Sequence, residues 1–198
     1  MRLQVNINLT RQNLRNRRKN LSSQERARAS LEISKNLLQS NLLSTSTAIG
    51  IYLQNDGEAD PECIVKNYSV KKKSFYVPVI NNDDSKLLLF SKYEHKMQFK
   101  KNKYGIREPE SPTLVDANCL DVVLMPLVGF DRTGNRIGMG GGFYDRTFQF
   151  LSGRKKTKPL LIGLAYSIQE VANIPNRPWD IPLNFIATEN EIICAKQK

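Results

Sequence analysis

The chain has 198 residues, and 30 lysines and arginines against 19 aspartates and glutamates give it a formal net charge of +11. This length predicts a single domain spanning residues 1–198, and the absence of a run of about 18 apolar residues argues against a membrane span. One histidine and three widely spaced cysteines argue against a histidine-based triad or a multi-histidine metal site, and together with a polar N-terminus they favour a cytoplasmic protein.

The first forty residues predict two helices. A basic helix is expected over residues 10–19 after a loose lead-in, with Arg11 and Arg15 one turn apart on a shared face. Residues 22–25 read Ser-Ser-Gln-Glu, which is the spacing of a capping box and begins the second helix. The residues expected on the core face of this helix are Ala27, Leu31, Leu38 and Leu42.

Strands and helices alternate along the rest of the chain. Asp60 and Pro61 predict the start of a helix that ends near Val70, and Pro78 indicates a bulge or the end of a strand. Residues 92–118 are polar and are expected to be irregular. The expected strands are 47–53, 75–80, 86–91, 120–128, 160–166, 184–188 and 191–195. The alternation predicts a three-layer α/β/α fold with a central, mainly parallel sheet and helices at the N-terminus.

A glycine-rich stretch at residues 134–146 lies between the apolar 120–128 strand and a short helix expected over 143–151 and closed by Gly153. It reads Gly-Asn-Arg-Ile-Gly-Met-Gly-Gly-Gly-Phe-Tyr-Asp-Arg. A strand, a glycine loop and a helix start in this order offer backbone N–H groups to a phosphate. The loop matches neither the Walker A pattern nor the dinucleotide fingerprint, so a tight connection that only needs flexible backbone is the alternative.

Charged side chains accompany this loop. Arg136 and Arg146 lie on either side of the glycines, and Asp145 is expected in the first helical turn, where a carboxylate is favoured and is able to bind Mg²⁺. The basic composition also fits an anionic partner, either a small molecule or a nucleic acid. No nucleic-acid-binding motif accompanies the charge, so we expect no nucleic-acid partner.

Together these features resemble the 5-formyltetrahydrofolate cyclo-ligase family, also called methenyltetrahydrofolate synthetases. The likeness covers nearly the whole chain, and the run Gly-Met-Gly-Gly-Gly-Phe-Tyr-Asp at 138–145 is highly specific to that family. The other segments that carry it are the basic N-terminal helix, Leu53 with Gly57-Glu58, Gly-Ile-Arg-Glu-Pro at 105–109, and Trp-Asp-Ile-Pro-Leu at 179–183. The resemblance implies an ATP-dependent ligase of folate one-carbon metabolism that converts 5-formyltetrahydrofolate to 5,10-methenyltetrahydrofolate through an iminophosphate, releasing ADP and phosphate.

The resemblance also implies a role for particular residues. The residues implied to bind ATP are Arg11, Arg15, Arg136, Ile137, Gly138, Met139, Gly140, Gly141, Gly142, Phe143 and Tyr144. The residues implied to bind the folate are Leu53, Glu58, Met139, Gly140, Gly141, Gly142 and Phe143, with Tyr104 and Ile106 as further candidates. The residues implied to be catalytic are Arg136, Tyr144 and Asp145, and the implied Mg²⁺ ligands are Asp145 and Asp180.

Each role has a simpler structural alternative. Asp145 has a favourable charge at a helix start, Asp180 is a turn-forming residue, and Arg11 and Arg15 belong to a basic helix face that solvent is able to cover. Which of the two arginines is the main phosphate contact stays open. For the whole protein, the alternatives are a related ATP-dependent enzyme acting on another N-formyl or carboxylate substrate, and a basic nucleic-acid-binding protein. We expect a monomer.

Overall fold

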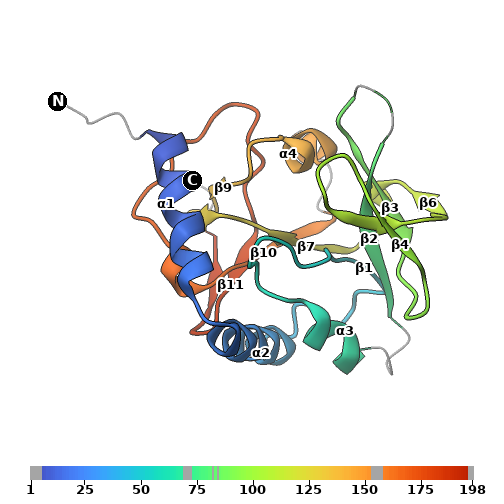
Figure 1. The fold of residues 1–198 in the computed structure, drawn as a ribbon, viewed down its shortest axis with the longest axis horizontal. Coiled ribbons are helices and arrows are strands. Elements are labelled where there is room, and N and C mark those ends of the chain that lie inside the picture. Colours follow the sequence, from blue (N-terminus) through green and yellow to red (C-terminus); the bar gives the residue numbers. More distant parts are fainter. Residues whose placement is uncertain (1–5, 69–72, 82, 84, 153–157, 196–198) are drawn as a thin grey trace.

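The fold is organised around one mixed sheet (Figure 1). The computed structural model describes residues 6–68, 73–81, 83, 85–152 and 158–195. In sheet order, the eight strands of this part of the chain are β12 (Ile192–Cys194), β11 (Phe185–Ala187), β10 (Leu160–Leu164), β7 (Val122–Pro126), β1 (Ala48–Gly50), β2 (Ser74–Ile80), β3 (Leu88–Lys92) and β6 (Leu114–Val115). The five from β11 to β2 run parallel, and β12, β3 and β6 pair antiparallel at the two edges.

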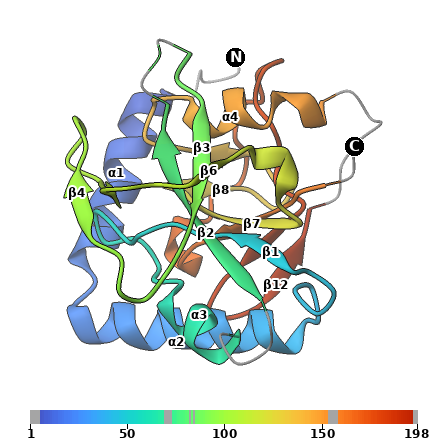
Figure 2. The same cartoon turned by 90° about the vertical axis from the view of Figure 1, so that its right-hand side faces the viewer.

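Helices cover both faces of the sheet, which confirms the predicted fold class. Figures 1 and 2 show α2 (Ser23–Gln39) and α3 (Glu62–Tyr68) on one face and α4 (Phe143–Thr147) on the other. The central strand β7 is buried on both faces, since Val122 and Leu124 belong to the core beneath α2 while Val123 and Met125 belong to the opposite core. The short 3₁₀ helices η1 (Ala117–Cys119) and η2 (Gln149–Leu151) border that second core.

Helix α1 (Ile7–Asn20) begins three residues earlier than predicted, because the side chain of Asn6 caps it by accepting from the N–H groups of Asn8 and Leu9. It packs against the 3₁₀ helix η3 (Ser167–Gln169), where Leu14 meets a small cluster of buried residues. The first part of the predicted lead-in, residues 1–5, lies outside the described residues. Within the described part of the chain, no helix is long and apolar enough to span a membrane.

The capping box that begins α2 is confirmed, but its predicted core face is wrong. Ala27 is exposed, and Leu31 keeps 41% of its surface accessible. Leu38 and Leu42 pack partly buried against the core. The residues that α2 buries are Ser30, Ile33, Ser34 and Leu37. Because two of these four residues are serines, the buried face does not show an apolar spacing in the sequence. The Ser34 hydroxyl donates to the carbonyl of Ser30, and the Ser30 hydroxyl accepts from the N–H of Asp60.

The expected irregular region 92–118 contains regular structure. A hairpin of β4 (Phe99–Lys101) and β5 (Arg107–Pro109) is followed by β6 and η1. A second small hairpin, β8 (Gly129–Phe130) with β9 (Arg136–Ile137), separates β7 from the glycine loop, so the loop follows β9 instead of the central strand. These two- and three-residue strands are too short to show a period in the sequence.

Other predicted boundaries shift in ways the contacts explain. The helix expected over 143–151 divides into α4 and η2, and its expected end, Gly153, lies outside the described residues. Val70, the expected end of the helix that begins near Asp60, also lies outside them. Pro78 neither bulges nor ends β2. Pro78 pairs with Phe90 of β3 on one side. On the other side it lies beyond Tyr76, the last residue of β2 that pairs with β1, so the missing N–H of proline removes no hydrogen bond between strands. At the start of η3, the side-chain oxygen of Gln169 accepts from the backbone N–H of Tyr166 at 2.8 Å.

Candidate active site

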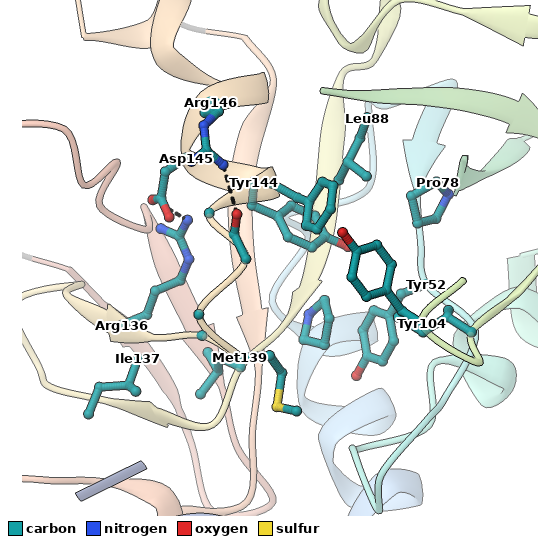
Figure 3. Close-up of a pocket in the computed structure, with 18 of the residues that line it drawn as sticks. Tyr52, Pro78, Leu88, Tyr104, Arg136, Ile137, Met139, Tyr144, Asp145 and Arg146 are labelled. Carbon is teal, nitrogen blue, oxygen red and sulfur yellow. Dashed lines mark hydrogen bonds and ion pairs between the residues drawn. The ribbon is translucent and has the colours of Figure 1, made fainter. Parts of the chain in front are cut away.

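A cavity of about 860 Å³ opens at the carboxyl edge of the parallel strands. Residues near the carboxyl ends of β2 and β7, or just after β1 and β7, line it, as expected for a ligand site in an α/β sheet. Figure 3 shows Arg136, Asp145 and Arg146 on one side and Tyr52, Tyr104, Pro78 and Leu88 on the other. The cavity therefore has a charged end and an aromatic end.

The glycine loop forms part of the cavity wall between two arginines. Arg11 Nε donates to the carbonyl of Gly138 at 2.7 Å, and Arg146 Nη1 donates to the carbonyl of Gly141 at 2.7 Å. The backbone N–H groups of residues 139–142 donate to no described residue. The two arginines therefore bind carbonyl groups of the loop, while its backbone N–H groups remain available to a ligand. Such a set of N–H groups is typical of an anion-binding site.

Glycine is required in this loop by its backbone. Gly140 has φ of +99° and Gly142, which precedes α4, has φ of +68°, a region that side chains disfavour. A Cβ on Gly142 would also lie 2.8 Å from Nη1 of Arg146. A larger residue at position 142 would therefore strain the backbone and displace the arginine that holds the loop.

Arg136 and Asp145 form a partly buried ion pair at the charged end. Arg136 Nη2 lies 2.6 Å from Asp145 Oδ1, and the arginine side chain is only 7% exposed. Arg136 also donates to the carbonyl of Ile181, whose own N–H reaches Asp145 Oδ1 at 3.2 Å. The pair thus ties the start of α4 to β9 and to the segment around residue 181, and fixes both charged groups beside the glycine loop.

The predicted Mg²⁺ ligands both line the cavity. Both contacts that the described residues make to the Asp145 carboxylate end on Oδ1, and Asp180 uses Oδ2 to accept from the N–H of Arg177 at 3.0 Å. Each carboxylate therefore keeps one oxygen for a ligand. Among the described residues no group of three or more acidic, histidine or cysteine side chains is arranged to hold a metal. Two carboxylates fit Mg²⁺ that arrives with a nucleotide, since this ion takes most of its remaining ligands from phosphate and water.

The predicted folate residues outside the glycine loop also line the cavity. Leu53 and Glu58 lie on its wall, and Tyr104 stands edge-on to Phe143 with ring centroids 5.6 Å apart. Burial raises the pKa of Glu58 to about 7, against the smaller opposing effect of the Arg18 charge. Burial also raises the pKa of the Tyr144 phenol, and the negative charge of Glu58 raises it further. This phenol therefore stays protonated and is able to donate a hydrogen bond.

The structure separates the two predicted basic residues of α1. Arg11 lies on the cavity wall, whereas Arg15 is not among the wall residues and makes two bonds to Asp56, at 2.9 and 3.1 Å. Two other cations converge on the same carboxylate, Arg18 at 2.7 Å and Lys19 at 2.8 Å. This geometry favours Arg11 as the residue of α1 that meets a ligand.

Sequence reasoning missed Arg18 and Asp56. Arg18 is fully buried and donates to the carbonyl of Leu127 at 3.1 Å as well as to Asp56. It lies one turn after the buried Leu14, so helical spacing places it on the inner face of α1. That spacing is the signal that could have identified it, but a charged residue is not normally assigned to a core.

Comparison with known proteins identifies the family of this chain. Residues 5–189 match the model of the 5-formyltetrahydrofolate cyclo-ligase family. The 5-formyltetrahydrofolate cyclo-ligase of Haemophilus influenzae is 36% identical over 177 residues, covering 87% of this chain and 92% of that protein. The Escherichia coli protein of the same name is 31% identical over 181 residues, covering 90% and 98%.

Solved structures show the same fold. The structure of Aquifex aeolicus 5,10-methenyltetrahydrofolate synthetase superposes with a TM-score of 0.80 at 27% identity, covering 97% of this chain and 94% of that one. The class defined by this fold and its relatives is that of ligases in folate one-carbon metabolism. The chain belongs to the 5-formyltetrahydrofolate cyclo-ligase family, as its sequence features predicted.

Proposed function

We propose that the cavity binds MgATP at its charged end and 5-formyltetrahydrofolate at its aromatic end, and that the chain converts the folate to 5,10-methenyltetrahydrofolate with release of ADP and phosphate. The observation that carries this proposal is the glycine loop. The loop lines the same cavity as the tyrosines and Glu58, and its N–H groups at residues 139–142 donate to no described residue. A nucleotide phosphate held by the loop would therefore meet a ligand seated against the tyrosines.

The reaction requires that the two substrates are positioned correctly, and it does not require a nucleophile from the protein. The formyl oxygen of the folate attacks the γ-phosphorus and ADP leaves, giving an iminophosphate. The 10-nitrogen then attacks the formyl carbon and gives up its proton, and the C–O bond breaks as phosphate departs with the former formyl oxygen. Phosphoryl transfer is accelerated chiefly by alignment and by neutralising the charge on the phosphate oxygens.

The residues of this chain fit those tasks. We assign the N–H groups of the loop, with Arg11 and Arg136, to the phosphate oxygens, and Tyr144 to hydrogen bonding beside them. Asp145 and Asp180 would hold Mg²⁺, which neutralises phosphate charge when bound. Glu58 and Leu53 would contact the folate ring. We further propose that the chain acts as a monomer in the cytoplasm, with residues 1–198 as one domain.

A matched pair of aspartate variants tests the assignment. We expect wild-type protein to form the methenyl product only when ATP and Mg²⁺ are both present, and Asp145→Ala to reduce the rate by at least about 100-fold. Asp116→Ala removes an exposed carboxylate outside the cavity and should leave the rate unchanged. Equal rates in all three proteins would remove Asp145 from the mechanism. Binding of MgATP without any folate turnover would favour a related enzyme with another substrate.

A further inference from the structure

Glu108, on strand β5, is a buried acid that neither the predicted site nor the proposed mechanism uses. The residue is 7% exposed and lines the cavity. In the part of the chain that the structure describes, no lysine, arginine or histidine lies within ion-pairing distance of it. A buried carboxylate without a counter-ion is unfavourable unless something else satisfies it.

The two carboxylate oxygens of Glu108 have different surroundings. Oε1 accepts from the backbone N–H of Ile80, at the end of β2, and from Asn102 Nδ2, each at 2.8 Å. No described residue donates to Oε2. Among the described residues, the side-chain nitrogen or oxygen atom that is fully buried without a hydrogen-bond partner is Arg18 Nε. Oε2 of Glu108 is therefore not fully buried, and because Glu108 lines the cavity, we infer that this oxygen is accessible from it.

The two bonds to Oε1 fix the direction of the carboxylate. Ile80 belongs to the main sheet, and Asn102 lies in the turn of the β4–β5 hairpin, where its Oδ1 accepts from the N–H groups of Tyr104 and Ile106. Glu108 therefore joins the hairpin that carries Tyr104 to the end of β2. Its free oxygen has a set orientation before any ligand binds, which is the preorganisation that selective binding needs.

Glu58 shows a similar arrangement in the segment after β1. Its Oε2 accepts from the N–H of Asn55 at 3.1 Å, and no described residue donates to its other oxygen. Two ionisable acids from separate segments of the chain thus present free acceptor oxygens in the same cavity. Ionised carboxylates accept hydrogen bonds and repel phosphate, so these groups favour a ligand with several N–H donors and disfavour a nucleotide phosphate.

We propose that Glu108 is a specificity-determining contact for the folate, with Oε2 accepting from the N–H donors of the reduced pterin ring while Glu58 accepts from others. The inference rests on the proposed function, because it identifies the folate as the donor-rich ligand. The acid pair also sets the orientation of the two substrates, since it excludes triphosphate from the aromatic end.

Replacement of Glu108 by glutamine separates this role from that of a structural anchor. The amide oxygen of Glu108→Gln is able to keep both bonds of Oε1, which places the NH₂ group where Oε2 stood. A donor would then face the N–H groups of the ring. We expect the dissociation constant for 5-formyltetrahydrofolate, measured by calorimetry without ATP, to rise about 10- to 100-fold. The dissociation constant for MgATP and the unfolding midpoint should stay at their wild-type values.

Glu110→Gln is the matched control, because this acid is exposed just beyond β5 and does not line the cavity. It should bind both ligands as wild type does. Wild-type folate affinity in Glu108→Gln would overturn the proposal and leave Glu108 as an anchor of the hairpin. Equal weakening of both ligands with a lower unfolding midpoint would overturn it as well. Failure of wild-type protein to bind the folate while it binds MgATP would instead overturn the proposed function, and with it this contact.

Discussion

Asp56 joins helix α1 to the segment after β1, and its charge can be removed with little change of shape. Its φ of +50° lies in a region that asparagine tolerates better than alanine, so Asp56→Asn tests the charge without adding backbone strain. The change leaves the guanidinium of Arg18, which is fully buried, without its anion. Removing one partner of a buried ion pair costs about 3–5 kcal/mol, and because the amide oxygen still accepts one bond we expect about 3 kcal/mol.

Thermal unfolding followed by circular dichroism measures this loss. For a protein of this size, about 3 kcal/mol corresponds to a decrease of roughly 6–12 °C in the unfolding midpoint. Lys19→Met is the control, because Lys19 contacts the same carboxylate from a side chain that is 51% exposed, and such pairs contribute about 0–1 kcal/mol. If Asp56→Asn unfolds at the same temperature as Lys19→Met, the account of the buried pair is wrong.

The effect of Asp56 on stability should also depend on pH. Burial acts to raise the pKa of Asp56, but hydrogen bonds from Arg15 and Lys19 and the charge of Arg18 outweigh it and hold the pKa well below its usual value. A lowered pKa in the folded state stabilises the protein above the unfolded value, near 4, and the stabilisation is lost as the pH falls below it. The difference between wild type and Asp56→Asn should therefore be full at pH 7 and shrink in acid.

Two further predictions concern Glu58 and Gly134. Because Glu58 has a pKa of about 7 and must be ionised to accept from the folate, wild-type affinity for 5-formyltetrahydrofolate should increase about tenfold from pH 6 to pH 8, and calorimetry should find this dependence lost in Glu58→Gln. Gly134→Ala should unfold at a lower temperature than Gly105→Ala: both positions have positive φ, but a Cβ on Gly134 would lie 2.6 Å from the carbonyl oxygen of Leu183, whereas one on Gly105 meets nothing within 4 Å. Equal midpoints for the two alanine variants would contradict the packing argument.

Local sequence was enough to predict features that depend on neighbouring residues. The capping box at Ser22 and the glycine-rich segment before α4 were both read from spacing, and the structure has them. The parallel sheet followed from alternating strands and helices, because parallel strands need crossover connections. The most specific part of the family resemblance is a contiguous run of residues, 138–145, which forms the glycine loop and the start of α4.

Features that depend on distant contacts could not be read in this way. Arg18 is buried because Asp56, 38 residues further along the chain, supplies its anion. Glu108 was noticed only as part of a motif, since its role depends on Ile80 in another strand. Two serines concealed the buried face of α2, where their hydroxyls bond to backbone groups. Arg18, Glu108 and Ser30 each occupy a buried position that a tertiary partner makes acceptable, whereas Ser34 bonds to a carbonyl of its own helix.

The central claim is that one cavity couples phosphoryl transfer from ATP to closure of the folate ring. The most direct test follows the absorbance of 5,10-methenyltetrahydrofolate and the release of inorganic phosphate in the same reaction, started by adding MgATP to protein and 5-formyltetrahydrofolate. The account predicts one phosphate per methenyl product and no phosphate above background when the folate is left out. Phosphate release that is independent of the folate, or methenyl product formed without ATP, would contradict it.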